Sequence, residues 1–121
     1  MLLKDFYKVN ALNVVENMAT ATITINKDHA VFKGHFPGNP VTPGVCMMQI
    51  IKELTEQIVN EKLFMNSASN IKFMSIINPE KNSDLELTLD ITKTDNSYTV
   101  KNTTKFEDTI ALKLTTNFKI K

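Results

Sequence analysis

Alternation of apolar and polar residues predicts that much of the chain folds as β-strands. In Met18–Ile25, alanine or isoleucine occupies every second position and threonine fills the positions between them. A period of two places the apolar side chains on one face of a strand, and β-branched residues favour this conformation. The segment Phe6–Val15 also has strand character, so we expect a hairpin that turns near Glu16 and Asn17.

The second half of the chain repeats this period. We expect strands over Ser69–Ile77, Leu85–Ile91, a stretch through Tyr98 and Val100, and Thr109–Ile120. The first of them is expected to turn four side chains to one side, namely Ile71, Phe73, Ser75 and Ile77. Polar turns are expected at Pro79–Ser83 and Asp95–Asn96.

Residues 45–63 carry the one pattern that is typical of an α-helix. The first half is apolar on every side, with Val45, Met47, Met48, Ile50, Ile51, Leu54, Ile58 and Val59. The second half is amphipathic, with Lys52, Glu53, Glu56, Gln57 and Glu61 expected to face outward. A helix that is apolar all round is buried all round, so other structure should wrap its beginning. The segment Asn66–Asn70 is expected to break it.

These elements predict one α+β domain over residues 1–121, with two strands, one long helix and four further strands. One helix cannot cover all of these strands unless the sheet curls around it. We therefore expect a curled antiparallel sheet of about five to six strands around a central helix.

A loop between the second strand and the helix concentrates the residues that restrict or free the backbone. All three glycines and three of the four prolines lie within Lys33–Val45. Glycine permits positive φ and proline fixes φ, so this mixture predicts a stiff loop that is neither helix nor sheet. The loop presents His35 and then starts the helix, which favours a built site. The alternative is a purely structural turn with an incidental surface histidine.

Composition narrows the classes of partner. The net charge of +1 argues against a nucleic-acid surface. All fourteen basic residues are lysine, so no guanidinium can clamp a phosphate or carboxylate. The one cysteine, Cys46, excludes an internal disulfide and favours a reducing compartment. The chain shows no signal-peptide core and no apolar run long enough to span a membrane, so we expect a cytoplasmic protein. We expect neither a cofactor nor a metal.

The stretch GHFPGNPVTPGV, residues 34–45, resembles the signature of the 3-hydroxyacyl-(acyl carrier protein) dehydratases. The resemblance implies the hotdog fold and the removal of water from a 3-hydroxyacyl thioester in fatty-acid or related biosynthesis. It implies that His35 is the base and that the backbone N–H of Gly44 bonds the thioester oxygen. Such a role suits the unpaired first N–H groups of a helix. Further substrate contacts are expected from Phe36, Val45 and Met48.

The resemblance places the catalytic acid fourteen residues after the histidine, where this chain has Gln49. In the family this position holds an aspartate or glutamate. A primary amide can hydrogen-bond a hydroxyl but has no proton to give at useful pH. Losing a general acid typically costs about 10²–10⁴-fold in rate. Gln49 could instead bond only to loop backbone. Glu53 lies one turn further on the same face and could supply a carboxylate through a water.

Other residues have plainer explanations. Cys46 lies in the first turn of the helix, where the dipole lowers a thiol pKa, but a small buried residue is the simpler interpretation. His29 is expected on the surface. Core positions are expected for Met47, Met48, Ile51, Met65 and Met74. Contacts with an acidic carrier protein or a phosphopantetheine phosphate could come from Lys33, Lys52 and Lys72.

Three functions remain open. The first is a dehydratase acting on an acyl carrier protein or coenzyme A thioester. The second is a thioesterase in which His35 and Gln49 position water against the thioester carbonyl. The third is a non-catalytic acyl-binding subunit that pairs with an active relative. The family implies a homodimer or higher homo-oligomer, with the histidine of one chain facing the acid position of the other.

Overall fold

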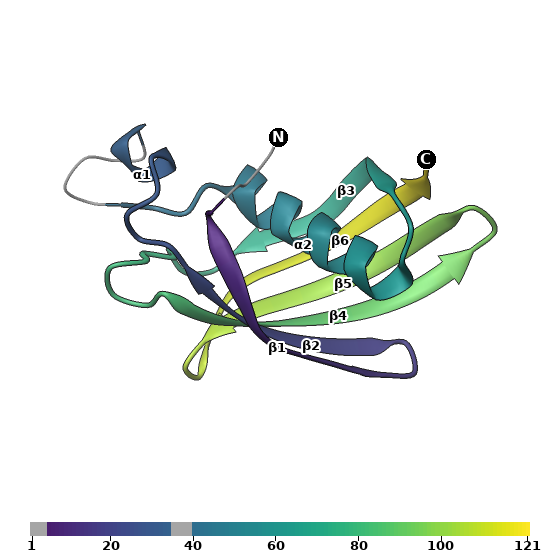
Figure 1. The fold of residues 1–121 in the computed structure, drawn as a ribbon, viewed down its shortest axis with the longest axis horizontal. Coiled ribbons are helices and arrows are strands. Elements are labelled where there is room, and N and C mark those ends of the chain that lie inside the picture. Colours follow the sequence, from purple (N-terminus) through teal and green to yellow (C-terminus); the bar gives the residue numbers. More distant parts are fainter. Residues whose placement is uncertain (1–4, 35–39) are drawn as a thin grey trace.

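The computed structural model describes residues 5–34 and 40–121. Within these residues, six strands form one antiparallel sheet in the order β1-β2-β4-β5-β6-β3. The strands are β1 (Tyr7–Val15), β2 (Met18–Ile25), β3 (Leu63–Phe73), β4 (Asp84–Thr94), β5 (Ser97–Phe106) and β6 (Thr109–Ile120). The helices are α1 (Val31–Gly34) and α2 (Gly44–Val59). Figure 1 shows α2 lying lengthwise over the curved sheet, so the predicted architecture is confirmed.

Both predicted hairpins are confirmed by the strand register. Val15 pairs with Met18 across the turn at Glu16, which has a φ of 57°. Thr94 pairs with Ser97 across the turn at Asp95, which has a φ of 50°. Acidic and amide side chains tolerate this left-handed conformation better than most residues, which helps Asp95 to close the turn.

The core lies between α2 and the inner face of the sheet. The alternate residues of β2 and β4 point into it, as their sequence pattern predicts. From α2, the buried residues are Cys46, Met47, Ile50, Ile51, Leu54 and Thr55. These positions fall on one stripe of a 3.6-residue helix, so the sheet covers one face of α2.

The expectation that α2 begins buried on every side is wrong. Val45 is 58% exposed and Met48 is half-buried, because the sheet covers only the opposite face. The helix is also shorter than predicted. It ends at Val59, and Asn60 caps it in the left-handed conformation with a φ of 57°. Asparagine is one of the few residues that favour this cap.

Strand β3 departs most from its prediction. It begins at Leu63, includes the segment Asn66–Asn70 that was expected to be a break, and ends at Phe73. It pairs with β6 along one side and forms an edge of the sheet. Two bulges interrupt the pairing, so simple alternation does not predict which side chains face inward. Ile71 and Phe73 are exposed rather than aligned with the buried Ile77.

A short helix also replaces part of the expected loop, because Lys33 and Gly34 belong to α1. The expected surface position of His29 is wrong, since its ring is half-buried and packs edge-on against Phe6. The Nδ1 atom of His29 accepts a hydrogen bond of 3.0 Å from the Val31 N–H at the start of α1. In β6 the alternation shifts by one residue, so that Ala111 and Leu112 are both buried. The described helices are all too short or too polar to cross a membrane.

Candidate active site

A cleft of about 420 Å³ opens beside the first residue of α2. One wall is the segment 41–44 and the other is the segment 73–77. The Thr42 N–H donates a 2.9 Å hydrogen bond to the Ile77 carbonyl, which ties the two walls together. The Met74 N–H donates to the Ala111 carbonyl at 2.8 Å and anchors the second wall to β6. The lining is mainly apolar and consists of Val41, Thr42, Pro43, Gly44, Phe73, Met74, Ser75, Ile76 and Ile77.

Gly44 allows a close approach of the two walls. A Cβ atom built on Gly44 would lie 2.7 Å from Cζ of Phe73, which is far inside van der Waals contact. Pro43 precedes the helix in extended conformation and, within the described residues, gives it no side-chain cap. The N–H groups of Cys46 and Met47 donate to the Pro43 carbonyl, whereas those of Gly44 and Val45 have no partner among the described residues and lie at the positive end of the helix dipole. The cleft thus pairs an apolar wall with backbone donors.

Thr42 is a feature of the cleft that the sequence did not reveal. Its side chain is 4% exposed, and Oγ1 has no hydrogen-bond partner within the part of the chain that the structure describes. A buried hydroxyl without a partner costs on the order of 1–3 kcal/mol, so this side chain is an unusual feature of the wall. A threonine in a Gly/Pro-rich loop gives no sequence signal for such burial.

The second wall was also missed as part of a site. Met74 was predicted to be a core residue, but it is 49% exposed and lines the cleft. Met65 is half-buried, whereas Met47 and Ile51 lie in the core as predicted. Met74 and Ile76 are exposed because they follow β3, which forms an edge of the sheet.

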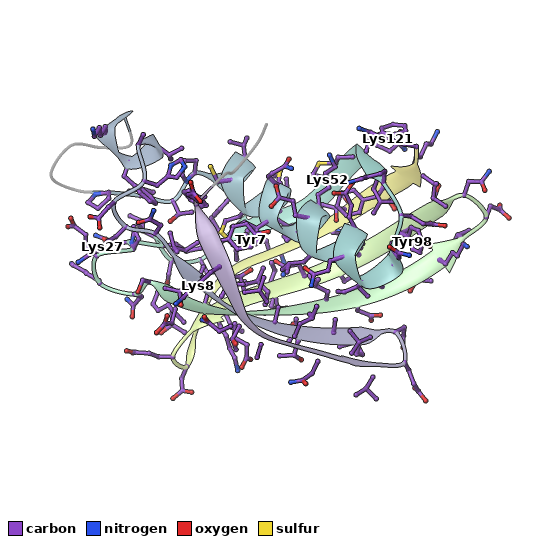
Figure 2. The ribbon with its side chains drawn as sticks, viewed as in Figure 1. Tyr7, Lys8, Lys27, Lys52, Tyr98 and Lys121 are labelled. Carbon is purple, nitrogen blue, oxygen red and sulfur yellow. The ribbon has the colours of Figure 1, made fainter. Side chains whose placement is uncertain are left out.

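Gln49 lies on the half-exposed face of α2, one turn after Val45. Its Nε2 atom donates a 3.0 Å hydrogen bond to Oε2 of Glu53. The Tyr7 hydroxyl donates to the other oxygen, Oε1 of Glu53, at 2.7 Å. Figure 2 shows Tyr7 beside α2, although it belongs to the first strand. The three polar side chains form a connected network, which we call the Tyr7–Glu53–Gln49 network.

Tyr7 stays neutral over a wide range of pH. Burial raises the pKa of its hydroxyl, and the hydrogen bond and the charge of Glu53 raise it further. The Glu53 carboxylate thus has a firm neutral donor on one oxygen and the Gln49 amide on the other. Sequence spacing placed Gln49 and Glu53 on one face, but Tyr7 lies 46 positions before Glu53 and has no motif that links them.

The remaining predicted site residues lie as follows. His35 and Phe36, the expected base and a substrate contact, lie outside the described residues. Gly44 lines the cleft, while Val45 and Met48 do not belong to its lining. Lys33 and Lys72 are exposed and Lys52 is half-buried.

Cys46 is a core residue, and its surroundings do not suit a nucleophile. Its side chain is buried, and burial raises the pKa of the thiol, so the reactive thiolate is disfavoured. Within the described ranges, no cluster of histidine, cysteine or acidic side chains could hold a metal ion.

Comparison with solved structures assigns the fold to the hotdog class, which includes dehydratases and thioesterases. The dehydratase heterocomplex ApeI:P from Xenorhabdus doucetiae aligns over 93% of this chain and 96% of its own, with a TM-score of 0.71 and 18% identity. A hypothetical thioesterase with coenzyme A from Streptococcus pneumoniae aligns over 99% and 91%, with a TM-score of 0.70 and 9% identity. At these identities the likeness concerns the fold alone.

The sequence comparisons define the family. The family model described as ApeI-like, ApeI dehydratase, matches residues 11–112. The chain is also 32% identical over 112 residues to the 3-hydroxyacyl-[acyl-carrier-protein] dehydratase FabZ of Lactobacillus helveticus, covering 86% of this chain and 74% of the relative. For FabZ of Levilactobacillus brevis the match has 32% identity and spans 53% of that protein's length. This chain belongs to the ApeI-like dehydratase family, which confirms the resemblance seen in its loop.

Proposed function

We propose that this protein removes water from a 3-hydroxyacyl thioester to give a 2-enoyl thioester. The observation that carries the proposal is the apolar cleft at the start of α2, where backbone donors and an apolar wall meet. A thioester has the matching chemistry, since its carbonyl accepts hydrogen bonds and its acyl chain is apolar. The membership in a dehydratase family supports the same reaction.

In this proposal the thioester carbonyl accepts a hydrogen bond from the Gly44 N–H. The developing enolate charge would then lie at the positive end of α2, where backbone donors stabilise it. The acyl chain packs against the apolar wall that includes Phe73, Met74 and Ile76. His35 takes the proton from C2, a task suited to an imidazole at neutral pH.

The proton balance decides how the hydroxyl leaves. The C2 proton goes to His35, the electron pair forms the C2–C3 double bond, and the C3–O bond breaks. The departing oxygen must gain a proton to leave as water. Gln49 has none to give, so the proton comes back from the His35 imidazolium or from a solvent water. We expect slower turnover than with a carboxylic acid at position 49, by roughly 10²–10⁴-fold.

We propose that two copies of this chain join along β3. The end of the molecule that carries the cleft exposes a group of large apolar side chains, which comprises Val45, Ile71, Phe73, Met74 and Ile76. Such a concentration of exposed apolar surface beside an unpaired sheet edge is typical of an interface. The family implies that His35 of one copy faces position 49 of the other across such an interface.

The carrier is proposed to be acyl carrier protein, as for the FabZ relatives, with coenzyme A as the alternative. The exposed lysines Lys33 and Lys72 offer positive charge to an acidic carrier. A cytoplasmic location fits the one reduced and buried cysteine.

The direct test is to incubate the purified protein with 3-hydroxyacyl thioesters of several chain lengths, on both carriers, and to follow the 2-enoyl product. Turnover that disappears in His35→Ala would support the proposal. Absence of product on every substrate, with folded protein, would overturn it.

Thioester hydrolysis is the second candidate, and Gln49 favours it. An amide can hold a water against the thioester carbonyl without giving up a proton. Release of free thiol from saturated acyl thioesters, which cannot be dehydrated, would identify this activity. A third possibility is a subunit that acts only together with a relative, since ApeI:P is a dehydratase heterocomplex. Activity that appears only after a catalytically competent relative is added would show it.

A further inference from the structure

The Tyr7–Glu53–Gln49 network contains two side chains, Tyr7 and Glu53, that the proposed reaction does not use. Glu53 receives one hydrogen bond on each carboxylate oxygen, from Gln49 Nε2 at 3.0 Å and from the Tyr7 hydroxyl at 2.7 Å. All three side chains are half-buried. Shielding from solvent strengthens such bonds and keeps the side chains in one arrangement.

The network fixes which end of the Gln49 amide is free. A carboxylate only accepts hydrogen bonds, so it can contact the amide nitrogen but repels the amide oxygen at the same distance. The nitrogen of Gln49 is therefore turned toward Glu53. Within the part of the chain that the structure describes, Oε1 of Gln49 has no hydrogen-bond partner. Gln49 therefore offers a ligand its Oε1 acceptor and the second N–H of Nε2, both held in one orientation.

We propose that Glu53 is a positioning residue that fixes the Gln49 amide with Oε1 available as an acceptor, so that the site favours acyl chains carrying a hydroxyl at C3. This inference rests on the proposed function, because it takes position 49 as the position that faces the substrate hydroxyl. A 3-hydroxyl donates its hydrogen to Oε1, whereas a saturated chain has no polar group at C3 to bond. Tyr7 holds Glu53 in place from β1 and completes the arrangement.

Binding measurements test this without turnover. The probes are two pantetheine amides of equal chain length, one with a 3-hydroxyacyl group and one with a saturated acyl group. The amide linkage makes the C2 protons too weakly acidic for rapid removal, so the hydroxyl survives. One neutral hydrogen bond predicts that the folded wild-type protein binds the 3-hydroxyacyl probe about 3- to 10-fold more tightly.

Variants of the network should remove this preference and leave binding of the saturated probe unchanged. Glu53→Ala frees the Gln49 amide to rotate, so the preference for the 3-hydroxyacyl probe should fall toward equal binding of the two probes. Tyr7→Phe deletes one hydroxyl and should reduce the preference in part. The matched control is Glu56→Ala, which removes a half-buried carboxylate from the same helix. This carboxylate accepts a 2.8 Å hydrogen bond from the Leu63 N–H. It should keep the full preference.

The inference is overturned if the wild type binds both probes equally, or if Glu53→Ala keeps the preference. It is also overturned if Glu53→Ala weakens both probes to the same degree as Glu56→Ala does, because the role is then structural. A hydroxyl preference that depends on Glu53 in a protein without dehydration would support the inference and refute the proposed reaction. Dehydration by a protein that binds both probes equally would support the proposed reaction and refute the inference.

Discussion

Gln49 and Glu53 lie one turn apart on α2, and their order along the helix decides which chemistry faces the ligand. Position 49, which is nearer the start of α2, holds the amide, and position 53 holds the carboxylate. The sequence was enough to predict that the two share a face, because i and i+4 are neighbours on a helix. It could not predict the third member, since Tyr7 reaches Glu53 only through the folding of β1 over α2.

Exchanging the two residues should convert the site without breaking the network. In Gln49→Glu/Glu53→Gln, the amide at position 53 can donate to the new carboxylate and still accept from Tyr7. A carboxylic acid then stands where the departing hydroxyl is proposed to lie, and we expect dehydration to rise by roughly 10²–10⁴-fold. The rate of 2-enoyl thioester formation measures this.

The single variant Gln49→Glu is the control for the exchange. It places two carboxylates side by side, which should destabilise the protein at neutral pH. Equal rates for the exchanged protein and the wild type would contradict the placement of residue 49 at the reacting end of the substrate.

The raised pKa of Tyr7 predicts that the protein loses stability at alkaline pH. Burial and Glu53 raise the pKa of the folded Tyr7 hydroxyl above the usual value of about 10. Above that value the unfolded chain loses the proton while the folded chain keeps it, so the free energy of unfolding falls as pH rises. Below it, the contribution is fully present.

Urea unfolding of wild type and Tyr7→Phe from about pH 8 to about pH 11 measures this contribution. The fourteen lysines titrate in both proteins, so their effect cancels in the difference between the two free energies. We expect this difference to shrink above about pH 10, and a difference that is constant with pH would contradict the role of the hydroxyl.

At the scale of elements, the two ends of α2 explain which parts of the prediction succeeded. The start at Gly44 follows from a Gly/Pro loop that leads into an apolar run, and a local pattern is enough to predict it. The end at Val59 depends on Asn60 adopting positive φ and on Leu63 joining β6. Pairing with a distant strand overrides the weak local signal of residues 60–70.

Gly44→Ala should block the cleft with little cost to the fold. The added methyl would displace the end of the Phe73 ring, which is the far end of a flexible side chain that is 56% exposed in the single chain. Alanine also favours the helix by about 0.5–1 kcal/mol, which offsets the displacement. We therefore expect the free energy of unfolding to change by less than about 1 kcal/mol, while binding of a saturated acyl pantetheine amide weakens about 10-fold or more.

Gly34→Ala is the matched control, because a Cβ at Gly34 meets nothing within 4 Å. It adds the same methyl without touching Phe73, and the saturated probe should bind as in the wild type. Unchanged binding in Gly44→Ala would show that acyl chains do not use this cleft.

At the scale of the whole molecule, the order of elements was predictable and the outer surfaces were not. The alternating strands and the apolar helix require a sheet that covers a helix, and this is the architecture observed. Exposed apolar side chains such as Phe73 and Ile76 look like core residues in the sequence, because hydrophobicity alone does not distinguish a core from an interface. That distinction needs the position of β3 at the sheet edge.

The proposed dimer can be tested at Ile76, which is 66% exposed beside the cleft. Ile76→Lys should turn the dimer into a monomer in analytical ultracentrifugation, since a lysine in an apolar interface loses its hydration. The matched control is Val15→Lys on the opposite edge strand, where the valine is 70% exposed. It should remain a dimer, and a monomer in both variants or in neither would contradict the assigned interface.

The bulge in β1 has a consequence for how far such an assembly can grow. The register of β1 against β2 shifts between Val9 and Ala11. When two copies join through β3, the combined sheet ends in a β1 strand on each side. Both edge strands carry bulges, which interrupt the row of N–H and C=O groups, but the β3 edge adds the exposed apolar group that favours pairing, whereas the large apolar side chains exposed on β1 are only valines. The sheet is therefore expected to stop at two molecules, and a deletion that straightens β1 would open a route to fibrils.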